Sequence, residues 1–206
     1  MNRSSPKTST KAWLLATTLA CAPLFAINAQ ADSSNSDEPE VLGFVEWLVL
    51  KDPELRMKAR LDTGALTSSL HAVNIEPFEK DGQEWIRFEI PLDDHHDLDD
   101  TEKAGDGDEV NVALTFERPV KRIVGIKRKN AETQDRYVVD MEFCIAGSMH
   151  EAEFSLTDRH NFRYPALLGR RYMRDDNVAV DSSQGFLAQQ ECDYAELNEV
   201  VADHIE

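Results

Sequence analysis

Short segments in which apolar and polar residues alternate run through most of this chain, and they constrain its fold more than any other feature. Met57, Ala59 and Leu61 alternate with charged neighbours, and Ile86 and Phe88 repeat the same spacing. A period of two residues is typical of a strand with one buried face. The chain is therefore predicted to be all-β, with mainly antiparallel strands.

Turn signals divide this pattern into short elements. Asp52-Pro53, Asp81-Gly82 and Gly147-Ser148 each interrupt an apolar run. The predicted strands cover residues 41–50, 57–62, 69–75, 84–92, 110–116, 120–126, 137–145, 151–156, 164–168 and 177–181. Helical composition is confined to residues 170–174, directly after Gly169, and to the tail at residues 194–205, so a short helix and a C-terminal helix are expected.

The first 31 residues have the composition of a secretory signal. A basic start precedes the apolar stretch at residues 12–26, and Ala29-Gln30-Ala31 supplies the small residues that signal peptidase requires. Cleavage near Ala31 would release a periplasmic or secreted protein. Residues 18–21 offer an alternative, because they are similar to a lipobox and would anchor the protein through an acylated Cys21.

One domain is expected after the signal peptide at residues 1–31. Residues 32–40 are polar and predicted to be a flexible leader, residues 41–190 form the domain, and residues 191–206 form a helical tail. No other segment approaches transmembrane length, so no membrane insertion of the mature domain is expected. The formal net charge of −17 disfavours binding to nucleic acid.

Only two cysteines, Cys144 and Cys192, follow the predicted signal. An oxidising compartment would permit them to form a disulfide. Two separate thiols are an equal alternative on the sequence alone.

The segment Asp62-Thr63-Gly64-Ala65 lies where a predicted strand ends in a tight turn. Glycine lets the backbone approach the carboxylate, and the small alanine leaves room for a ligand. The segment resembles the active-site motif of pepsin-like and retroviral aspartic peptidases. That resemblance implies catalysis by Asp62 with Thr63 and Gly64, and substrate contacts by Ala65, Thr67 and His71.

A second element supports the resemblance about a hundred residues downstream. Leu167, Leu168, Gly169 and Arg170 are similar to the apolar-apolar-Gly-Arg element of retropepsins. In that fold the apolar strand packs beside the catalytic loop, and the helix after the glycine covers it. The resemblance therefore implies a retropepsin-like barrel in which these residues support the site.

The pattern is also similar to the bacterial retropepsin-like family that carries the name ATP-dependent zinc protease. The similarity covers residues 59–72, 118–127, 153–159 and 164–172. The chain has no Gly-Lys-Ser or Gly-Lys-Thr phosphate loop, so ATP use is not expected. It also lacks a His-Glu-x-x-His pair, so no cofactor is predicted; His71 is a minor candidate zinc ligand beside its simpler interpretation as a structural histidine.

The predicted function is exported aspartic endopeptidase activity on a peptide or protein substrate. Such enzymes activate water with two aspartates, and one chain supplies one Asp-Thr-Gly, so a homodimer is expected. A monomer would need a second acid such as Asp140, Asp158 or Asp181, although Asp158-Arg159 is interpreted as a structural ion pair. The alternatives are a zinc-dependent peptidase and a catalytically silent peptide-binding or protein-binding module.

Retropepsins close a hairpin flap over their substrate. The polar segment at residues 127–136, between two predicted strands, is the expected flap tip. The acidic stretch at residues 93–109 is the alternative mobile cover.

Overall fold

The structure is a computed structural model, and it describes residues 38–92, 113–126, 134–195 and 199–200. The predicted signal peptide, the acidic stretch at 93–109 and most of both the expected flap tip and the C-terminal helix lie outside the described residues. Strands dominate the described part, which confirms the all-β fold class. No helix within these ranges is long and apolar enough to span a membrane.

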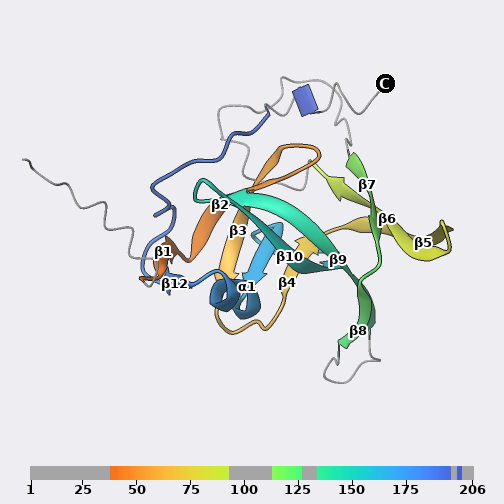
Figure 1. Cartoon of the computed structure of the whole chain (residues 1–206), viewed down its shortest axis with the longest axis horizontal. Coiled ribbons are helices and arrows are strands. Elements are labelled where there is room, and N and C mark those ends of the chain that lie inside the picture. Colours follow the sequence, from red (N-terminus) through yellow and green to blue (C-terminus); the bar gives the residue numbers. More distant parts are fainter. Residues whose placement is uncertain (1–37, 93–112, 127–133, 196–198, 201–206) are drawn as a thin grey trace, which may run out of the picture. The chain divides into compact units, whose positions relative to one another are not determined.

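Six strands form a closed barrel (Figure 1). They are β2 (Val45–Leu50), β3 (Leu55–Asp62), β4 (Ser68–His71), β9 (Gln134–Ile145), β10 (Ser148–Thr157) and β11 (Ala166–Gly169). Their order is β10-β4-β11-β3-β2-β9, and the antiparallel pairing of β9 with β10 closes the ring. Strand β8 (Arg122–Ile126) pairs with β9 outside the ring. Closure satisfies the backbone donors and acceptors that an open sheet would leave at its edges.

Strand β11 enters the barrel between two strands from the first half of the chain. It runs parallel to β3 and antiparallel to β4. The helix α1 (Arg170–Asp175) follows it directly, as the sequence predicts. This insertion brings the apolar-Gly element beside the Asp-Thr-Gly turn.

Two smaller sheets complete the described part. β5 (Val73–Lys80), β6 (Gln83–Pro91) and β7 (Ala113–Pro119) form an antiparallel three-stranded sheet. β1 (Glu40–Gly43) and β12 (Val178–Asp181) pair in parallel.

Two predicted strands are each divided in the structure. The strand expected at residues 69–75 breaks near Ala72, whose N–H donates to Thr157 O, so its halves β4 and β5 belong to different sheets. The strand expected at residues 41–50 breaks at Phe44, whose N–H donates to Gln184 O. In both cases a contact with a distant part of the chain ends the strand, and apolar patterning does not register such contacts.

The core follows the alternation seen in the sequence. Leu55, Met57, Ala59 and Leu61 point inward from β3 and are almost fully buried. Large side chains from other strands join them in one cluster, including Phe88, Phe143 and Phe154. Burial of such side chains is the main stabilising contribution to a barrel of this size.

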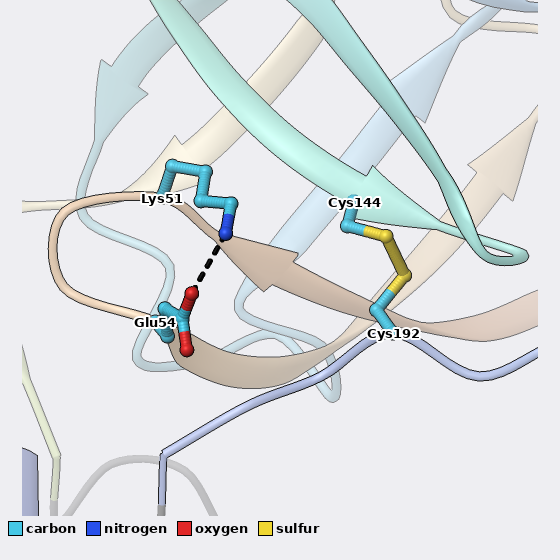
Figure 2. The surroundings of a disulfide bond; sticks show 4 residues. All are labelled: Lys51, Glu54, Cys144 and Cys192. Carbon is cyan, nitrogen blue, oxygen red and sulfur yellow. Dashed lines mark hydrogen bonds and ion pairs between the residues drawn. A yellow bond between two sulfur atoms is a disulfide. The ribbon is translucent and has the colours of Figure 1, made fainter.

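Residues 182–195, which we term the C-terminal strap, run along the outside of the barrel. Cys192 forms a disulfide with Cys144 at the end of β9 (Figure 2), so the paired alternative for the two cysteines is the one adopted. The buried Glu46 accepts hydrogen bonds from the N–H groups of Leu187 at 2.7 Å and Ala188 at 3.3 Å. The strap is thus attached both covalently and through a buried carboxylate.

Candidate active site

Asp62 is the last residue of β3, and the turn that follows it fixes its carboxylate. Asp62 Oδ1 accepts hydrogen bonds from the N–H groups of Gly64 at 2.9 Å and Ala65 at 3.3 Å. A Cβ on residue 64 would lie 3.1 Å from the same oxygen, so glycine permits this close approach. The Asp62 side chain is 32% exposed. The carboxylate is therefore held by backbone donors and remains open to solvent.

The apolar-Gly element supports this turn. Gly169 pairs with Asp62 in the parallel β3–β11 register, and its N–H donates to Ser68 Oγ at 3.1 Å. Directly after it, the N–H of Arg170 donates to Ala65 O at 2.9 Å, and the Arg170 side chain donates to Gly64 O at 3.2 Å. The first residue of α1 therefore holds the Asp62 turn through two hydrogen bonds.

Leu167 and Leu168, the other two predicted support residues, lie in different surroundings. Leu168 is fully buried in the core, and Leu167 is half-buried and lines the cavity beside Asp62. The predicted substrate contacts Ala65 and Thr67 are half-buried in the turn, while Thr63, predicted to act with Asp62 in catalysis, is exposed.

A cavity of about 330 Å³ lies beside Asp62. Three of its lining residues are arginines, and Asp62 is the one carboxylate among the described residues that line it. The lining residues are Phe44, Arg60, Asp62, Arg159, Phe162, Arg163, Tyr164 and Leu167. Although the chain is acidic overall, its candidate site is locally cationic.

Arg159 is the most deeply buried of the three arginines, with 7% of its surface exposed. Its guanidinium donates to Ser69 Oγ at 2.8 Å and to Tyr164 O at 3.2 Å, which are neutral acceptors. Burial, together with the charges of Arg136 and Arg60, lowers the pKa of Arg159 from its ordinary value to about 10, while the charge of Asp62 opposes that shift. A buried cation without a direct carboxylate partner in the described part of the chain is suited to an anionic ligand.

The predicted ion pair between Asp158 and Arg159 is wrong. Asp158 Oδ1 instead accepts from the His160 N–H at 2.9 Å and lies 2.7 Å from His160 Nδ1. These hydrogen bonds, the backbone one first, lower the pKa of the Asp158 carboxyl. The other acids considered as second catalytic groups also have local partners, since Asp140 pairs with Lys121 and Asp181 accepts from Ser183.

His71 lies at the end of β4, with 1% of its surface exposed, and it does not line the cavity. Its Nδ1 accepts a hydrogen bond from the Arg159 N–H at 2.8 Å. No group of three or more His, Cys, Asp or Glu side chains in the described ranges could hold a metal ion. Within those ranges, the residues around His71 therefore do not form a ligand set for zinc.

The sequence did not identify the cationic lining of the cavity. Arg60 follows the strand pattern of β3, whereas Arg159 and Arg163 come from a loop about a hundred residues later. Only the insertion of β11 beside β3 brings them together. The sequence features that included lining arginines were the family similarities at residues 59–72 and 153–159, which contain Arg60 and Arg159.

Residues 41–191 match a family model described as retropepsin-like aspartic endopeptidase RimB. A probable alpha-L-glutamate ligase of Shewanella pealeana is 36% identical over 154 residues, which cover 73% of this chain and 30% of the ligase. A second probable alpha-L-glutamate ligase, from Parasynechococcus marenigrum, is 35% identical over 134 residues, which cover 65% of this chain and 26% of that ligase. The chain thus spans about a third or less of these curated relatives, which are named as ligases and not as ATP-dependent zinc proteases.

A solved structure from Legionella pneumophila, of a protein with unknown function, is also similar. It aligns with a TM-score of 0.58 and 32% identity, over 73% of this chain and 98% of that one.

Proposed function

The chain belongs to the RimB-like family of retropepsin-like aspartic endopeptidases, and on that premise we propose that it hydrolyses peptide bonds with Asp62 as its catalytic carboxylate. The observation that carries the proposal is the Asp62 turn, in which two backbone N–H groups hold one carboxylate oxygen beside an open cavity. A carboxylate fixed in this way can orient a water molecule toward a bound carbonyl group without first reorganising.

We further propose a homodimer, in which the partner subunit's Asp62 supplies the second carboxylate. Two aspartates that share one proton are the arrangement by which this class activates water, because like charges at short range cannot both ionise. The cavity offers one carboxylate among its described lining residues, and the turn beside it exposes Leu66 to 50%. A two-fold axis near the turn would bury that leucine and bring the two carboxylates together.

The substrate we propose is an acidic peptide, with glutamyl peptides as the first class to test. Arg60, Arg159 and Arg163 line the cavity, and guanidinium groups bind carboxylates through paired hydrogen bonds. Relatives that contain a similar segment are named as glutamate ligases, which gives separate support for glutamate. The negative charge of the whole chain would then limit encounter with such substrates, so the local arginines must outweigh it.

The experiment that tests the proposal compares the wild-type chain with Asp62→Asn on fluorogenic peptides that differ only in Glu or Gln at each acidic position. The wild-type chain should cleave the Glu peptide, and Asp62→Asn should lose at least about a thousandfold in kcat while keeping its fold. Asparagine can still accept the two turn hydrogen bonds, so misfolding is not expected. Equal cleavage by both proteins would overturn the aspartic mechanism.

Two further measurements separate the alternative functions. Activity that a chelator removes, with stoichiometric zinc in the protein, would favour the metal peptidase. Tight binding of the Glu peptide without cleavage across acidic to neutral pH would favour a catalytically silent binding module. Sedimentation at increasing protein concentration reports on the dimer.

We also propose export, with cleavage near Ala31 or, as the minor alternative, a lipid anchor at Cys21. The Cys144–Cys192 disulfide supports an oxidising destination, because such bonds persist mainly outside the cytosol. Fractionation of cells that produce the full chain, with mass measurement of the mature N-terminus, tests this.

A further inference from the structure

One loop supplies half of the residues that line the cavity. Residues 158–165, which we term the cleft loop, connect β10 to β11. Their contributions to the lining are Arg159, Phe162, Arg163 and Tyr164. The geometry of the cavity therefore depends on how this loop is held.

His71 contacts the cleft loop near both of its ends. Its imidazole Nδ1 accepts from the N–H of Arg159 at 2.8 Å, and its own backbone N–H donates to Pro165 O at 2.8 Å. The next residue, Ala72, donates to Thr157 O at 3.1 Å, directly before the loop. The end of β4 thus fixes both ends of the loop, and the His71 side chain makes the contact to Arg159.

The same strand also holds the Arg159 side chain. Ser69, two residues before His71, accepts from Arg159 Nη1 at 2.8 Å. Backbone and guanidinium of Arg159 are therefore both bound to β4, and both contacts are buried. A buried N–H group needs an acceptor, so loss of the imidazole nitrogen would leave the Arg159 N–H without its partner and free the loop to move.

From these contacts we propose that His71 is a positioning residue of the site, which acts through Arg159 and sets the affinity for acidic peptides. This inference rests on the proposed function and deepens it. The required state is an unprotonated Nδ1, because that nitrogen must accept the N–H of Arg159. The role differs from direct substrate contact, since His71 is buried behind the lining.

Two amide substitutions distinguish this role from general packing. In His71→Asn the new side-chain oxygen would lie close to the position of Nδ1, whereas in His71→Gln the amide would lie near the position of Nε2. The full chain carrying Asp62→Asn serves as the parent, so that binding of a fluorescent Glu-rich peptide can be followed without turnover. His150→Asn is the matched control, because His150 is a half-buried histidine that pairs with Asp176 away from the cavity lining.

His71→Gln should weaken binding of the Glu peptide about tenfold, and His71→Asn should remain within about threefold of the parent. Hydrogen exchange of the Arg159 amide should accelerate in His71→Gln and stay slow in His71→Asn and His150→Asn. Adding Arg159→Met to His71→Gln should weaken binding no further than Arg159→Met alone, because both act through one contact.

Equal effects of His71→Asn and His71→Gln, unchanged exchange at the Arg159 amide, or a parent that does not bind the Glu peptide would each overturn the inference. These readouts need no catalysis. If the His71 dependence holds while the wild-type chain never cleaves, the proposed peptidase activity fails and the positioning role stands.

Discussion

Gly169 lies opposite Asp62 in the parallel pairing of β3 with β11, so both residues end their strands at the same level of the barrel. The glycine is also packed against the backbone of the Asp62 turn, since a Cβ there would lie 2.6 Å from Thr67 C and 2.7 Å from Thr67 O. Two motifs a hundred residues apart thus form one unit. A substitution at Gly169 should therefore change both the stability of the Asp62 turn and its geometry.

Gly169→Ala should therefore lower both stability and activity. The new methyl group would meet backbone atoms that cannot rotate away, and overpacking of this kind costs about 2 kcal/mol. Urea unfolding measures the loss of stability, and a lower rate of peptide cleavage would indicate that the Asp62 turn has been displaced. Gly82→Asn is the control, because its φ of +73° suits asparagine and its surroundings are open. Full activity in Gly169→Ala would contradict the tight packing.

Arg159→Met should abolish the preference for Glu peptides and leave the protein as stable as before, or more stable. Burial lowers the pKa of Arg159, which means that the folded state disfavours its charge at neutral pH. Methionine fills a similar volume without that cost, although Tyr164 O and Ser69 Oγ each lose a donor. Denaturant midpoints and the ratio of Glu to Gln cleavage check this, with the exposed Arg174→Met as control. A loss of more than about 2 kcal/mol would show that Arg159 is chiefly structural.

Glu153→Gln should destabilise the protein by about 1–2 kcal/mol near pH 7. Glu153 Oε2 accepts from Arg122 at 2.6 Å and from Arg171 at 2.9 Å, and so joins β8 to α1. The hydrogen bond from Arg122 is the main cause that lowers the pKa of Glu153 below 4.5. Because the folded pKa is lowered, this stabilisation is present above pH 4.5 and is lost as pH falls through the lowered value.

The difference between wild type and Glu153→Gln should accordingly shrink as the pH falls below about 4.5 and through the lowered pKa of Glu153. Chemical unfolding over this range provides the measurement, with Asp175→Asn as an exposed control whose partner is its neighbour Arg174. A constant difference at all pH values would argue against an ionised Glu153.

Replacement of both Cys144 and Cys192 by serine should destabilise the fold by about 2–4 kcal/mol. The disulfide joins residues 48 positions apart, and loop-closure entropy alone gives an upper value of about 4 kcal/mol. The strap should nevertheless stay attached, since Glu46 still binds Leu187 and Ala188. Unfolding in the presence and absence of a reductant measures the effect, and the serine variant itself should show no response to the reductant.

The fold could be predicted from local pattern because the Asp62 turn, the Leu167-Leu168-Gly169 element and the alternating strands are each contiguous in sequence. The alternation indicated an all-β fold, the resemblance of the two motifs to those of retropepsins implied the barrel, and the structure has one. Local pattern did not predict where a contact with a distant residue divides a strand. At Phe44, for example, the N–H donates to Gln184 O, and the strand expected at residues 41–50 is divided there.

Sequence motifs indicated the Asp62 turn and the Gly169-Arg170 element that supports it, but not the arginines that line the cavity. Asp62 carries a motif, but Arg159 looked like half of an ion pair with its neighbour Asp158, because adjacent opposite charges are the simplest pairing in sequence. In the structure the guanidinium turns to Ser69 on another strand, and Asp158 binds His160. Which partner a charged side chain chooses depends on burial and direction, and both are properties of the folded barrel.

The position of β11 between β3 and β4 also sets an order of events during synthesis. Until residues 166–169 have left the ribosome, β3 and β4 lack the strand that separates them, and their backbone groups face no partner there. The Asp62 turn would stay unorganised for the same interval, because Gly169 and Arg170 are still missing from it. A chain of this topology cannot organise its candidate site before most of it has been made, so the order of its strands alone would delay any activity of that site.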